Sequence, residues 1–326
     1  MHAKNLSLKL SARCCGKKNM IIVIHENNEW IPPFEDAFKK LNLNYDFWYL
    51  PEMDLSLGDI PPDAIFYNRM SASSHSRNHR YEPELAVGIL EWLEKHQRTV
   101  VNGSRALDLE ISKIRQYQEL EKFGIATPPT YATINKDRML DGANKIGYPL
   151  ISKHNRAGKG LGVFKFLNMR ALKNYINSNE FQASPDGINL IQKYISAPTN
   201  TIIRLEFIDS KFVYAVEVDT TDGFELCPAE NCSIESNCPT SFDEKFRILK
   251  DFKLDNIYLY EDFLIKNDIS IAGIEIIIDD QGKVWTYDVN TNTNYNPQAE
   301  HAANTSAPLK VAEYLQSLVD LKNLGS

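Results

Sequence analysis

After Asn19 the chain alternates between short apolar runs and amphipathic stretches. Ile21–Ile24 is a continuous apolar run, as in a buried strand, and Pro32–Leu41 has helical periodicity behind a proline start. Further strands are predicted at residues 45–50, 63–67 and 99–101, and a helix at 82–95. Strands that alternate with helices indicate a parallel sheet. The pattern therefore predicts a small open α/β layer ending near Ser104, without the GxGxxG that dinucleotide binding uses.

The middle of the chain carries a glycine-rich segment between two predicted strands. Arg105–Phe123 is predicted to be one helix, and a later strand runs to Lys153. The segment His154–Gly162 follows, and Val163–Phe166 returns as the second strand of a hairpin. Such a tip can fold over phosphates, because glycines leave backbone N–H groups accessible and lysines supply charge. The residues concerned are Gly158, Gly160, Gly162, Lys153 and Lys159.

A solvated basic hairpin is the alternative for this glycine-rich segment. It is not a Walker A loop, because GKS and GKT are absent and a strand, not a helix, follows it.

The last part of the chain is predicted to be rich in antiparallel strands. Strands are expected at residues 189–195, 202–208 and 212–219, the last two paired around Asp209-Ser210. Helices are expected at 244–252 and 257–266, and an amphipathic helix at 308–322 closes the chain.

Residues 271–294 predict a hairpin whose polar positions are unusual. Two β-rich runs flank the turn-forming cluster Asp279–Gly282. Asp288 and Asn290 project from one face of the second strand, and closing the turn brings Glu275 alongside Asp288. Adjacent carboxylates repel unless a cation lies between them, and such sparse oxygen ligands suit Mg²⁺ carrying nucleotide phosphates. The alternative is a half-exposed hairpin whose acidic face meets water.

Composition narrows the class of protein. The chain has 326 residues, 43% hydrophobic and 24% charged, which indicates a soluble globular protein of two or three compact units. A net charge of −7 argues against a general nucleic-acid partner. No apolar run approaches the roughly 20 residues of a membrane span, so no membrane partner is expected.

The N-terminal segment and the cysteines indicate in which compartment of the cell the protein is expected. Met1–Asn19 is basic but has no apolar core, so we expect a disordered lead-in, or an upstream start with Met20 opening the folded part, and not a secretory signal. Five cysteines, an odd number, favour free thiols in a cytoplasmic location. Cys227, Cys232 and Cys238 lack the CxxC spacing of zinc sites. For these three, ordinary thiols lining a turn, a metal site and a redox role all stay open.

Taken in order, several short motifs resemble the ATP-grasp superfamily, most closely its branch of ribosomal-protein glutamate ligases and related amino-acid ligases (RimK-type). The resemblance covers roughly residues 20–320. It rests on Asn102 and Lys113 in VVNGSRALDLEISK, on GIATP at 124–128, and on Lys153 with its glycine loop in YPLISKHNRAGKGLGV. The remaining motifs are LIQKYI at 190–195, Arg204 in TIIRLEF, and Glu275, Asp288 and Asn290.

The resemblance implies a fold and its divisions. The fold class is α/β (α+β), an ATP-grasp fold with an N-terminal Rossmann-like pre-grasp domain and two subdomains that enclose ATP. The expected divisions are a lead-in at 1–19, the pre-grasp domain at 20–104, a central and lid part at 105–195, and a C-terminal part with the metal site at 196–326.

The resemblance also implies roles for individual residues. Lys113, Lys153 and Lys159 would contact ATP phosphates under a lid formed by Gly158, Gly160 and Gly162. Gln192, Lys193, Tyr194 and Ile195 would form the hinge beside adenine. Arg204 is similar to the arginine that stabilises the transferring phosphoryl group. Glu275, Asp288 and Asn290 look like the ligands of Mg²⁺, with Mn²⁺ as the alternative ion.

The implied activity is that of a carboxylate–amine ligase. ATP would convert a small-molecule or peptide carboxylate into an acyl phosphate, which an amine attacks to give an amide, ADP and phosphate. A non-catalytic ATP-grasp protein that binds nucleotide and a partner, or a phosphotransferase that stops at phosphorylation, are the alternatives. Homo-oligomers are common in the family, and no feature of this sequence establishes one.

Substrate recognition is the least determined part. Asn292 and Asn294 lie in an amide-rich run directly after the metal hairpin and are read as a wall of the acceptor site. Arg69 opens a basic loop with His75, Arg77, His79 and Arg80, which is either solvated or binds an acidic substrate. Three departures from the family pattern stand out. Lys193 replaces an acidic hinge residue, and the first metal carboxylate is a Glu and the second an Asp, the reverse of a common arrangement. Residues 224–238 do not match the expected substrate strand.

Overall fold

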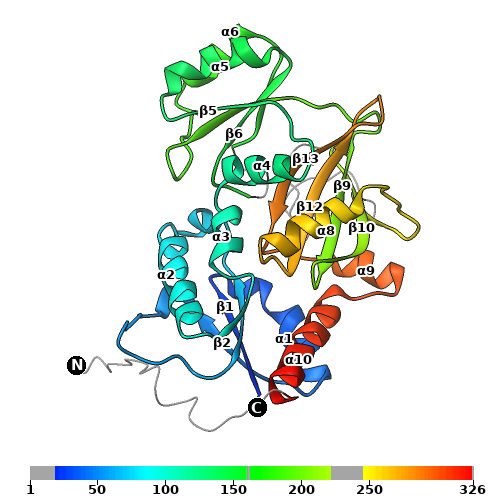
Figure 1. The fold of residues 1–326 in the computed structure, drawn as a ribbon. Coiled ribbons are helices and arrows are strands. Elements are labelled where there is room, and N and C mark those ends of the chain that lie inside the picture. Colours follow the sequence, from blue (N-terminus) through cyan, green and yellow to red (C-terminus); the bar gives the residue numbers. More distant parts are fainter. Residues whose placement is uncertain (1–18, 159, 161, 222–244, 325–326) are drawn as a thin grey trace, which may run out of the picture.

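The computed structural model describes residues 19–158, 160, 162–221 and 245–324, which form three sheets with helices packed around them (Figure 1). The strand orders are β2-β1-β3-β4, β5-β8-β6-β7 and β11-β10-β9-β12-β13. Short 3-10 turns at Asn28–Trp30, Leu50–Glu52, Ser74–Arg77 and Lys136–Arg138 lie between the larger elements.

The first sheet is parallel, as its alternation of strands and helices predicts. It contains β1 (Met20–His25), β2 (Asn44–Tyr49), β3 (Ile65–Arg69) and β4 (Thr99–Val101). Helices α1 (Pro32–Lys40) and α2 (Glu82–Lys95) pack beside it. Every residue of β1 is buried, which explains its uninterrupted apolar run.

The predicted helix 105–123 is wrong as a single element. The structure has α3 (Ser104–Glu110) and α4 (Lys113–Lys122), separated by an extended Ser112. Asn155 causes the break: its carbonyl accepts the N–H of Lys113, and its side-chain oxygen accepts the N–H of Ile114. These bonds satisfy N–H groups at the start of α4, so a new helix begins with Lys113.

The second sheet is antiparallel and contains the predicted glycine hairpin. Its strands are β5 (Thr130–Thr133), β6 (Leu150–His154), β7 (Phe164–Phe166) and β8 (Asn189–Lys193). Helices α5 (Met139–Ile146) and α6 (Met169–Ile176) lie together beside this sheet (Figure 1).

The third sheet is antiparallel and includes a strand where a helix was predicted. It contains β9 (Thr201–Ile208), β10 (Lys211–Asp219), β11 (Phe246–Leu249), β12 (Ile271–Ile278) and β13 (Val284–Asn290). The helix expected at 244–252 is wrong, because β11 occupies that stretch and pairs with the edge of β10. Phe246 is buried opposite Val218, so strand pairing overrides the helical pattern. Helix α8 (Ile257–Lys266) forms as expected.

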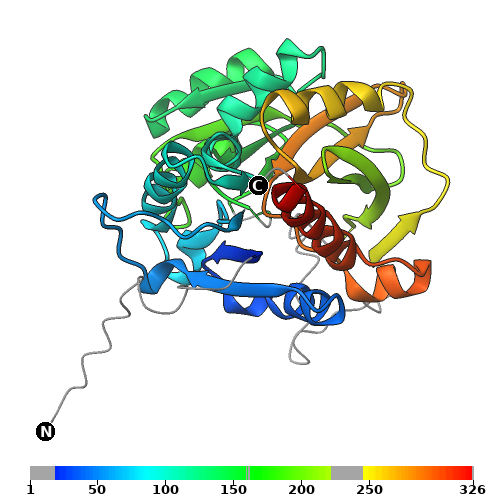
Figure 2. The ribbon, with the colours of Figure 1, turned by 60° about the horizontal axis from the view of Figure 1, so that its bottom comes forward.

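The C-terminal helix returns to the first layer. After α9 (Pro297–Ala303), helix α10 (Ala307–Leu324) lies against α1 (Figure 2). Val311 and Leu315 of α10 share a buried apolar cluster with Phe34 and Phe38 of α1. The end of the chain, predicted as part of the C-terminal unit, therefore also completes the core of the first one.

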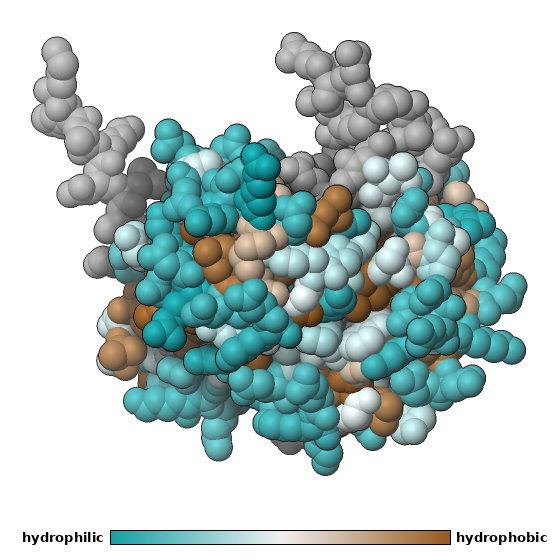
Figure 3. All heavy atoms as spheres, turned by 90° about the horizontal axis from the view of Figure 1, so that it is seen from above, coloured by the Kyte–Doolittle hydropathy of each residue, from teal (hydrophilic) through white to brown (hydrophobic). Residues whose placement is uncertain are grey.

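The surface differs from this apolar interior. The face seen from above is covered mainly by hydrophilic side chains, with apolar ones scattered among them (Figure 3). In the described part of the chain, no helix combines the length and apolarity that crossing a bilayer takes.

Asn102 joins the first layer to the third sheet. Its side chain is fully buried, and its Nδ2 donates to the carbonyls of Ile271 (2.7 Å) and Thr291 (2.8 Å). Its Oδ1 accepts the N–H groups of Ser270 (2.9 Å) and Ile271 (3.2 Å). A φ of 55° places the residue in the left-handed region that asparagine tolerates. One amide thus saturates four backbone groups from two distant segments.

We predict that Asn102→Ala lowers the free energy of unfolding by about 2–4 kcal/mol, because four buried backbone groups lose their partner. Asn42→Ala is the matched control, since Asn42 is also left-handed (φ 53°) but exposed. Chemical denaturation of both variants measures the difference. Equal destabilisation would mean that the backbone conformation, and not the hydrogen bonds, is what asparagine supplies.

Glu300 of α9 is a buried carboxyl group at the junction of α9, α10 and β10. Its Oε1 accepts from the Tyr214 hydroxyl (2.8 Å) and the Ala307 N–H (2.5 Å). Burial raises the pKa of Glu300 to about 7, although both hydrogen bonds oppose the shift. The folded protein therefore holds this proton more tightly than the unfolded chain does.

Because this pKa is raised, we predict that the contribution of Glu300 to stability is greatest below pH 4.5 and is lost as the pH rises through 7. Glu300→Gln keeps an acceptor oxygen and stays neutral. The variant should gain about 1–3 kcal/mol relative to wild type at pH 8, and nothing at pH 4. Denaturation at several pH values measures this; parallel curves for the two proteins would contradict it.

Candidate active site

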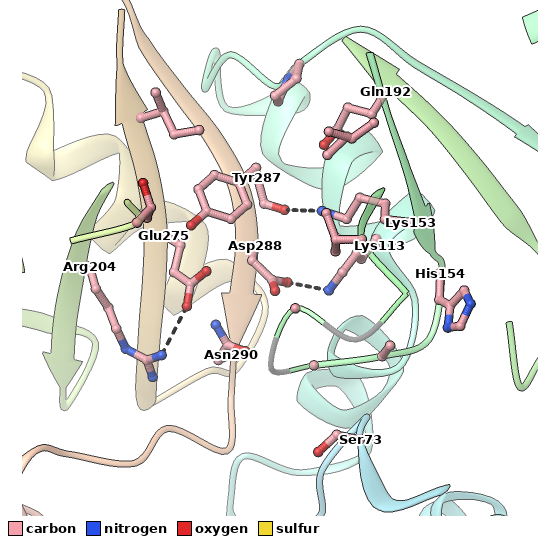
Figure 4. A pocket seen from close by; sticks show the side chains of 18 of the residues that line it. Ser73, Lys113, Lys153, His154, Gln192, Arg204, Glu275, Tyr287, Asp288 and Asn290 are labelled. Atoms are coloured by element: carbon pink, nitrogen blue, oxygen red, sulfur yellow. Dashed lines mark hydrogen bonds and ion pairs between the residues drawn. The ribbon is translucent and has the colours of Figure 1, made fainter. Parts of the chain in front are cut away.

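The β12–β13 hairpin brings its two carboxylates side by side, as predicted. Glu275 is the register partner of Asp288, with a bulge directly after Glu275. On its other side Glu275 is the register partner of Arg204 in β9. Figure 4 shows these side chains, together with Asn290, facing one region between the hairpin and α4.

Each carboxylate is bound by a cation from a different element. Asp288 Oδ1 lies 2.7 Å from Lys113 Nζ at the start of α4, and Glu275 Oε1 lies 3.1 Å from an Arg204 nitrogen (Figure 4). Burial raises the pKa of Glu275, with Arg204 opposing and Asp288 adding to the shift. The helix break that begins α4 at Lys113 is what places its ammonium here.

Lys153 of β6 is a buried ammonium held by neutral groups. Its Nζ donates to the Tyr117 hydroxyl (3.0 Å) and to the Tyr287 carbonyl (3.3 Å). Burial lowers the pKa of Lys153, while Asp288 and Glu275 oppose the shift at longer range. With no carboxylate of the described residues in ion-pair contact, its charge is directed at the cleft.

Arg204 is fixed by residues that the sequence interpretation missed. Its Nε donates to Glu206 Oε1 (2.6 Å), and its terminal nitrogen donates to the Thr293 hydroxyl. That hydroxyl in turn donates to Glu206 Oε2 (2.9 Å). A Cβ on Gly273 would lie 2.5 Å from the guanidinium, so glycine leaves the room that Arg204 needs. The spacing of Arg204 and Glu206 on one strand face was the only sequence signal for this arrangement.

The glycine segment lies between β6 and the first layer. Gly162 has a φ of 71°, and a Cβ there would come within 2.6 Å of the His154 ring. A Cβ on Gly158 would lie 3.4 Å from Ser73, in the loop after β3. Gly158 therefore lies close to the loop after β3, and Gly162 lies close to His154 of β6. Lys159, predicted to contact phosphate, lies outside the described residues, as do the five cysteines.

The predicted hinge follows the end of β8. Gln192 donates to the Thr130 hydroxyl (2.8 Å), and the backbone N–H groups of Lys193 and Tyr194 bond the carbonyls of Pro129 and Pro149. Among the described residues, the N–H of Ile195 has no hydrogen-bond partner. The backbone of Ile195 can therefore bind the edge of a planar base.

Most of the predicted site residues line one cleft. Of the predicted residues, it is lined by Lys113, Lys153, Gly158, Gly160, Gln192, Lys193, Tyr194, Ile195, Arg204, Glu275, Asp288, Asn290, Asn292 and Asn294. Residues that line it without having been predicted include Trp30, Ser71, Ser73, Glu110, His154 and Tyr287. Ser71 and Ser73 follow the carboxyl end of β3, where open α/β sheets bind ligands, and this position was the available signal.

The basic loop after β3 is largely neutralised by the protein itself. Arg77 and His79 both contact Glu26, and Arg80 pairs with Glu84. Arg69 is buried and does not line the cleft; it donates to Asn294, which does. The loop therefore supports the cleft wall and does not present a row of free cations.

The donor set at the hairpin fits a magnesium ion that also binds phosphates. Two carboxylates and one amide oxygen are hard oxygen ligands, and Mg²⁺ bound with nucleotide phosphates typically takes only one or two carboxylates from the protein. Asn290 Nδ2 lies 3.4 Å from the Gly273 carbonyl, which leaves its Oδ1 available. The cationic partners of Glu275 and Asp288 indicate that this pair attracts positive charge.

Comparison with known proteins finds related ligases. N-acetylaspartylglutamate synthase A of Mus musculus is 25% identical over 242 residues, which are 73% of this chain and 59% of that protein. Alpha-aminoadipate–LysW ligase LysX of Sulfurisphaera tokodaii is 27% identical over 160 residues, 48% of this chain and 52% of that ligase. The chain thus matches little more than half the length of these curated relatives. No protein-family model matches it.

The fold comparison agrees with the sheet topology. The ATP-grasp ligase PsnB, solved in complex with a minimal precursor, superposes with a TM-score of 0.65 at 15% identity, over 92% of this chain and 99% of PsnB. The predicted ATP-grasp fold is confirmed, with a parallel N-terminal sheet followed by two antiparallel sheets. The chain has the ATP-grasp fold, and the proteins that it resembles in sequence include the synthase and the ligase named above. A RimK-domain ATP-grasp protein of Sphaerobacter thermophilus superposes with a TM-score of 0.61 at 14% identity, over 90% of this chain and 99% of that protein.

Proposed function

We propose that the protein is an ATP-dependent carboxylate–amine ligase that forms an amide bond through an acyl phosphate and releases ADP and phosphate. The observation that carries this proposal is the set of adjacent charges Arg204–Glu275–Asp288–Lys113, in which two carboxylates and two cations from four elements meet in one cleft. The names of the relatives, which include N-acetylaspartylglutamate synthase, beta-citrylglutamate synthase and alpha-aminoadipate–LysW ligase, support the same class of reaction.

We assign the nucleotide to the cleft between β8 and the β12–β13 hairpin. The free N–H of Ile195 is suited to an adenine edge, and Lys153 and Lys113 are suited to the phosphates. Gly158, Gly160 and Gly162, with Lys159, would cover the phosphates. Glu275, Asp288 and Asn290 would hold Mg²⁺, or Mn²⁺, which when bound neutralises phosphate charge. PsnB, whose fold this chain shares, was solved with Mg and ADP.

In the first step, an oxygen of the substrate carboxylate attacks the γ-phosphorus of ATP, the bond to the bridging oxygen breaks, and ADP leaves. Charge on the transferring phosphoryl group is spread over its oxygens, so positioned cations lower the barrier. Lys153 and Arg204 can supply this charge without reorganising, because buried hydrogen bonds already hold both side chains.

In the second step, the amine nitrogen attacks the acyl carbon, phosphate leaves with its bonding electron pair, and the nitrogen loses a proton. The acyl phosphate reacts readily with water, so a loop that closes the cleft has a clear purpose. Arg204 is placed to stabilise the oxygen that becomes negative as the amine adds, since its guanidinium is anchored by Glu206 and Thr293.

The test is phosphate release from ATP with Mg²⁺ across pairs of small acids, amino acids and dipeptides. Mass spectrometry then checks each positive pair for a product equal to acid plus amine minus water. We expect release only when acid and amine are both present. A stable phosphorylated acid formed without an amine would replace the proposal by a phosphotransferase. Nucleotide binding without turnover on any pair would favour a non-catalytic binding protein.

Lys153→Ala should weaken ADP binding by about tenfold or more, because a hydrogen bond to a charged group contributes about 1.5–3 kcal/mol. Lys153→Met, which keeps the apolar stem, should show the same loss. Lys173→Ala, on the exposed side of α6, is the control and should bind normally. Titration calorimetry measures all three; unchanged affinity in both Lys153 variants would remove this lysine from the site.

Asp288→Asn should reduce Mg²⁺-dependent turnover by about a hundredfold and raise the Mg²⁺ concentration needed for half-maximal rate, because an amide replaces a charged ligand of the same shape. Asp280→Asn, exposed in the turn of the same hairpin, is the matched control. Steady-state rates over a range of Mg²⁺ give both numbers. An unaltered Mg²⁺ requirement would mean that the ion binds elsewhere.

A further inference from the structure

Two serines of the loop after β3 line the cleft from the side of the first layer. Ser71 is 7% exposed and Ser73 is 1% exposed, and both follow the carboxyl end of a parallel strand, where open α/β sheets bind ligands. The N–H of Ala72, which lies between them, donates to Glu110 of α3 (3.2 Å). The backbone of the two serines is therefore held in place by the protein itself, and their hydroxyl groups are largely shielded from bulk water.

The hydrogen bonds of these two hydroxyl groups leave one O–H donor unused. The two Oγ atoms lie 2.9 Å apart, so one hydroxyl donates to the other. Ser71 Oγ also accepts the N–H of Ser73 (3.1 Å), and Ser73 Oγ accepts from both terminal nitrogens of Arg77 (3.3 Å each). Each hydroxyl has a single hydrogen, so the one that accepts within the pair keeps its own O–H. No described residue accepts that hydrogen.

Arg77 strengthens the remaining donor without adding free charge to the cleft. Its guanidinium forms an ion pair with the buried carboxylate of Glu26 and at the same time donates to Ser73 Oγ. A hydroxyl group that accepts from a cation becomes a better donor, because successive hydrogen bonds polarise one another. The two serines therefore offer a directed, polarised O–H, whereas Lys113 and Lys153 of the same cleft supply positive charge.

The two serines lie close to the glycine segment that we propose to cover the phosphates. A Cβ on Gly158 would lie 3.4 Å from Ser73 Cβ and 3.8 Å from Ser73 Oγ. In the view of Figure 4, Ser73 lies below this segment and Lys113 lies above it. Gly158 has no side chain that could bind a phosphate oxygen, so at this point of the cleft the first layer, and not the segment, supplies a hydroxyl group.

We infer that the Ser71–Ser73 pair donates a hydrogen bond to an anionic oxygen at the reacting end of the cleft, on the γ-phosphoryl group or on the carboxylate that attacks it. The inference rests on the proposed ligase function and adds to it a donor from the first layer. Both groups become part of the same acyl phosphate in the first step. A donor that is already fixed stabilises charge on such an oxygen without reorganising.

A set of variants separates this donor from the fold of the loop. Ser71→Ala/Ser73→Ala removes both hydroxyl groups and with them the unused O–H. Each single variant keeps one hydroxyl, whose hydrogen has no described acceptor, so it should lose less than the double variant. Ser76→Ala is the matched control, because Ser76 is exposed in the same turn and donates to the Ser73 carbonyl (2.8 Å). Thermal melting first checks that each variant is folded.

Titration calorimetry then compares MgADP with the Mg²⁺ complex of AMPPNP, a non-hydrolysable ATP analogue that carries a γ-phosphoryl group. A second titration adds acetate, L-aspartate or L-glutamate to protein saturated with MgADP. If the donor binds the phosphoryl group, the double variant should bind AMPPNP about tenfold more weakly and ADP normally. If it binds the carboxylate, an acid should bind about tenfold more weakly and both nucleotides normally. Ser76→Ala should match wild type throughout.

Unchanged affinity of the double variant for AMPPNP and for every acid would overturn the inference and leave the ligase proposal standing. Equal losses for ADP and AMPPNP would also overturn it, because they would show that the serines only support the loop. Failure of wild type to bind MgADP would instead overturn the ligase proposal, and the inference with it.

Discussion

The structure depends on holding two carboxylates side by side within a largely buried sheet face. Glu275 and Asp288 repel each other, and burial increases the cost of that repulsion. A cation on each side compensates this repulsion: Arg204 of β9 pairs with Glu275, and Lys113 of α4 pairs with Asp288. Several otherwise unrelated features follow from this. Helix α4 has to begin at Lys113, and β12 needs glycine at 273 so that the Arg204 guanidinium fits.

The same constraint ties the second sheet to the third. Asn155, directly after β6, fixes the start of α4, and Lys153 of β6 contacts both Tyr117 of α4 and Tyr287 of β13. Gln116 adds hydrogen bonds in both directions to the backbone of Val289. The two lysines proposed to bind phosphate are therefore positioned by one continuous set of contacts. The glycine segment begins within that set, so these contacts fix the position of its first residues.

An element could be predicted from the sequence where the residues that determine it lie close together along the chain. The carboxylate hairpin was predictable down to its register, because the turn cluster and the strand period act within one short segment. The glycine hairpin was predictable for the same reason. The break before Lys113 was not, since the residue that causes it, Asn155, lies about forty positions away and only the fold brings it near. Strand β11 was not predictable either, because it forms by pairing with the edge of β10. The contact of Arg69 with Asn294 joins residues 225 positions apart, so the sequence alone could not show it.

Lys193 differs from the family pattern in its side chain, but the backbone of the proposed hinge does not depend on that side chain. Its side chain turns away from the hinge and donates to the Tyr148 carbonyl (3.1 Å), so the exchange of an acid for a lysine changes a structural contact. A planar base would meet the backbone of the hinge, whose N–H at Ile195 does not depend on the side chain at 193. The exchange of the two hairpin carboxylates has a similar consequence, because both types supply the same oxygen ligands and differ in reach by one methylene. The departures at Lys193 and at the hairpin carboxylates therefore leave unchanged the backbone N–H and the oxygen ligands on which the proposed nucleotide site rests.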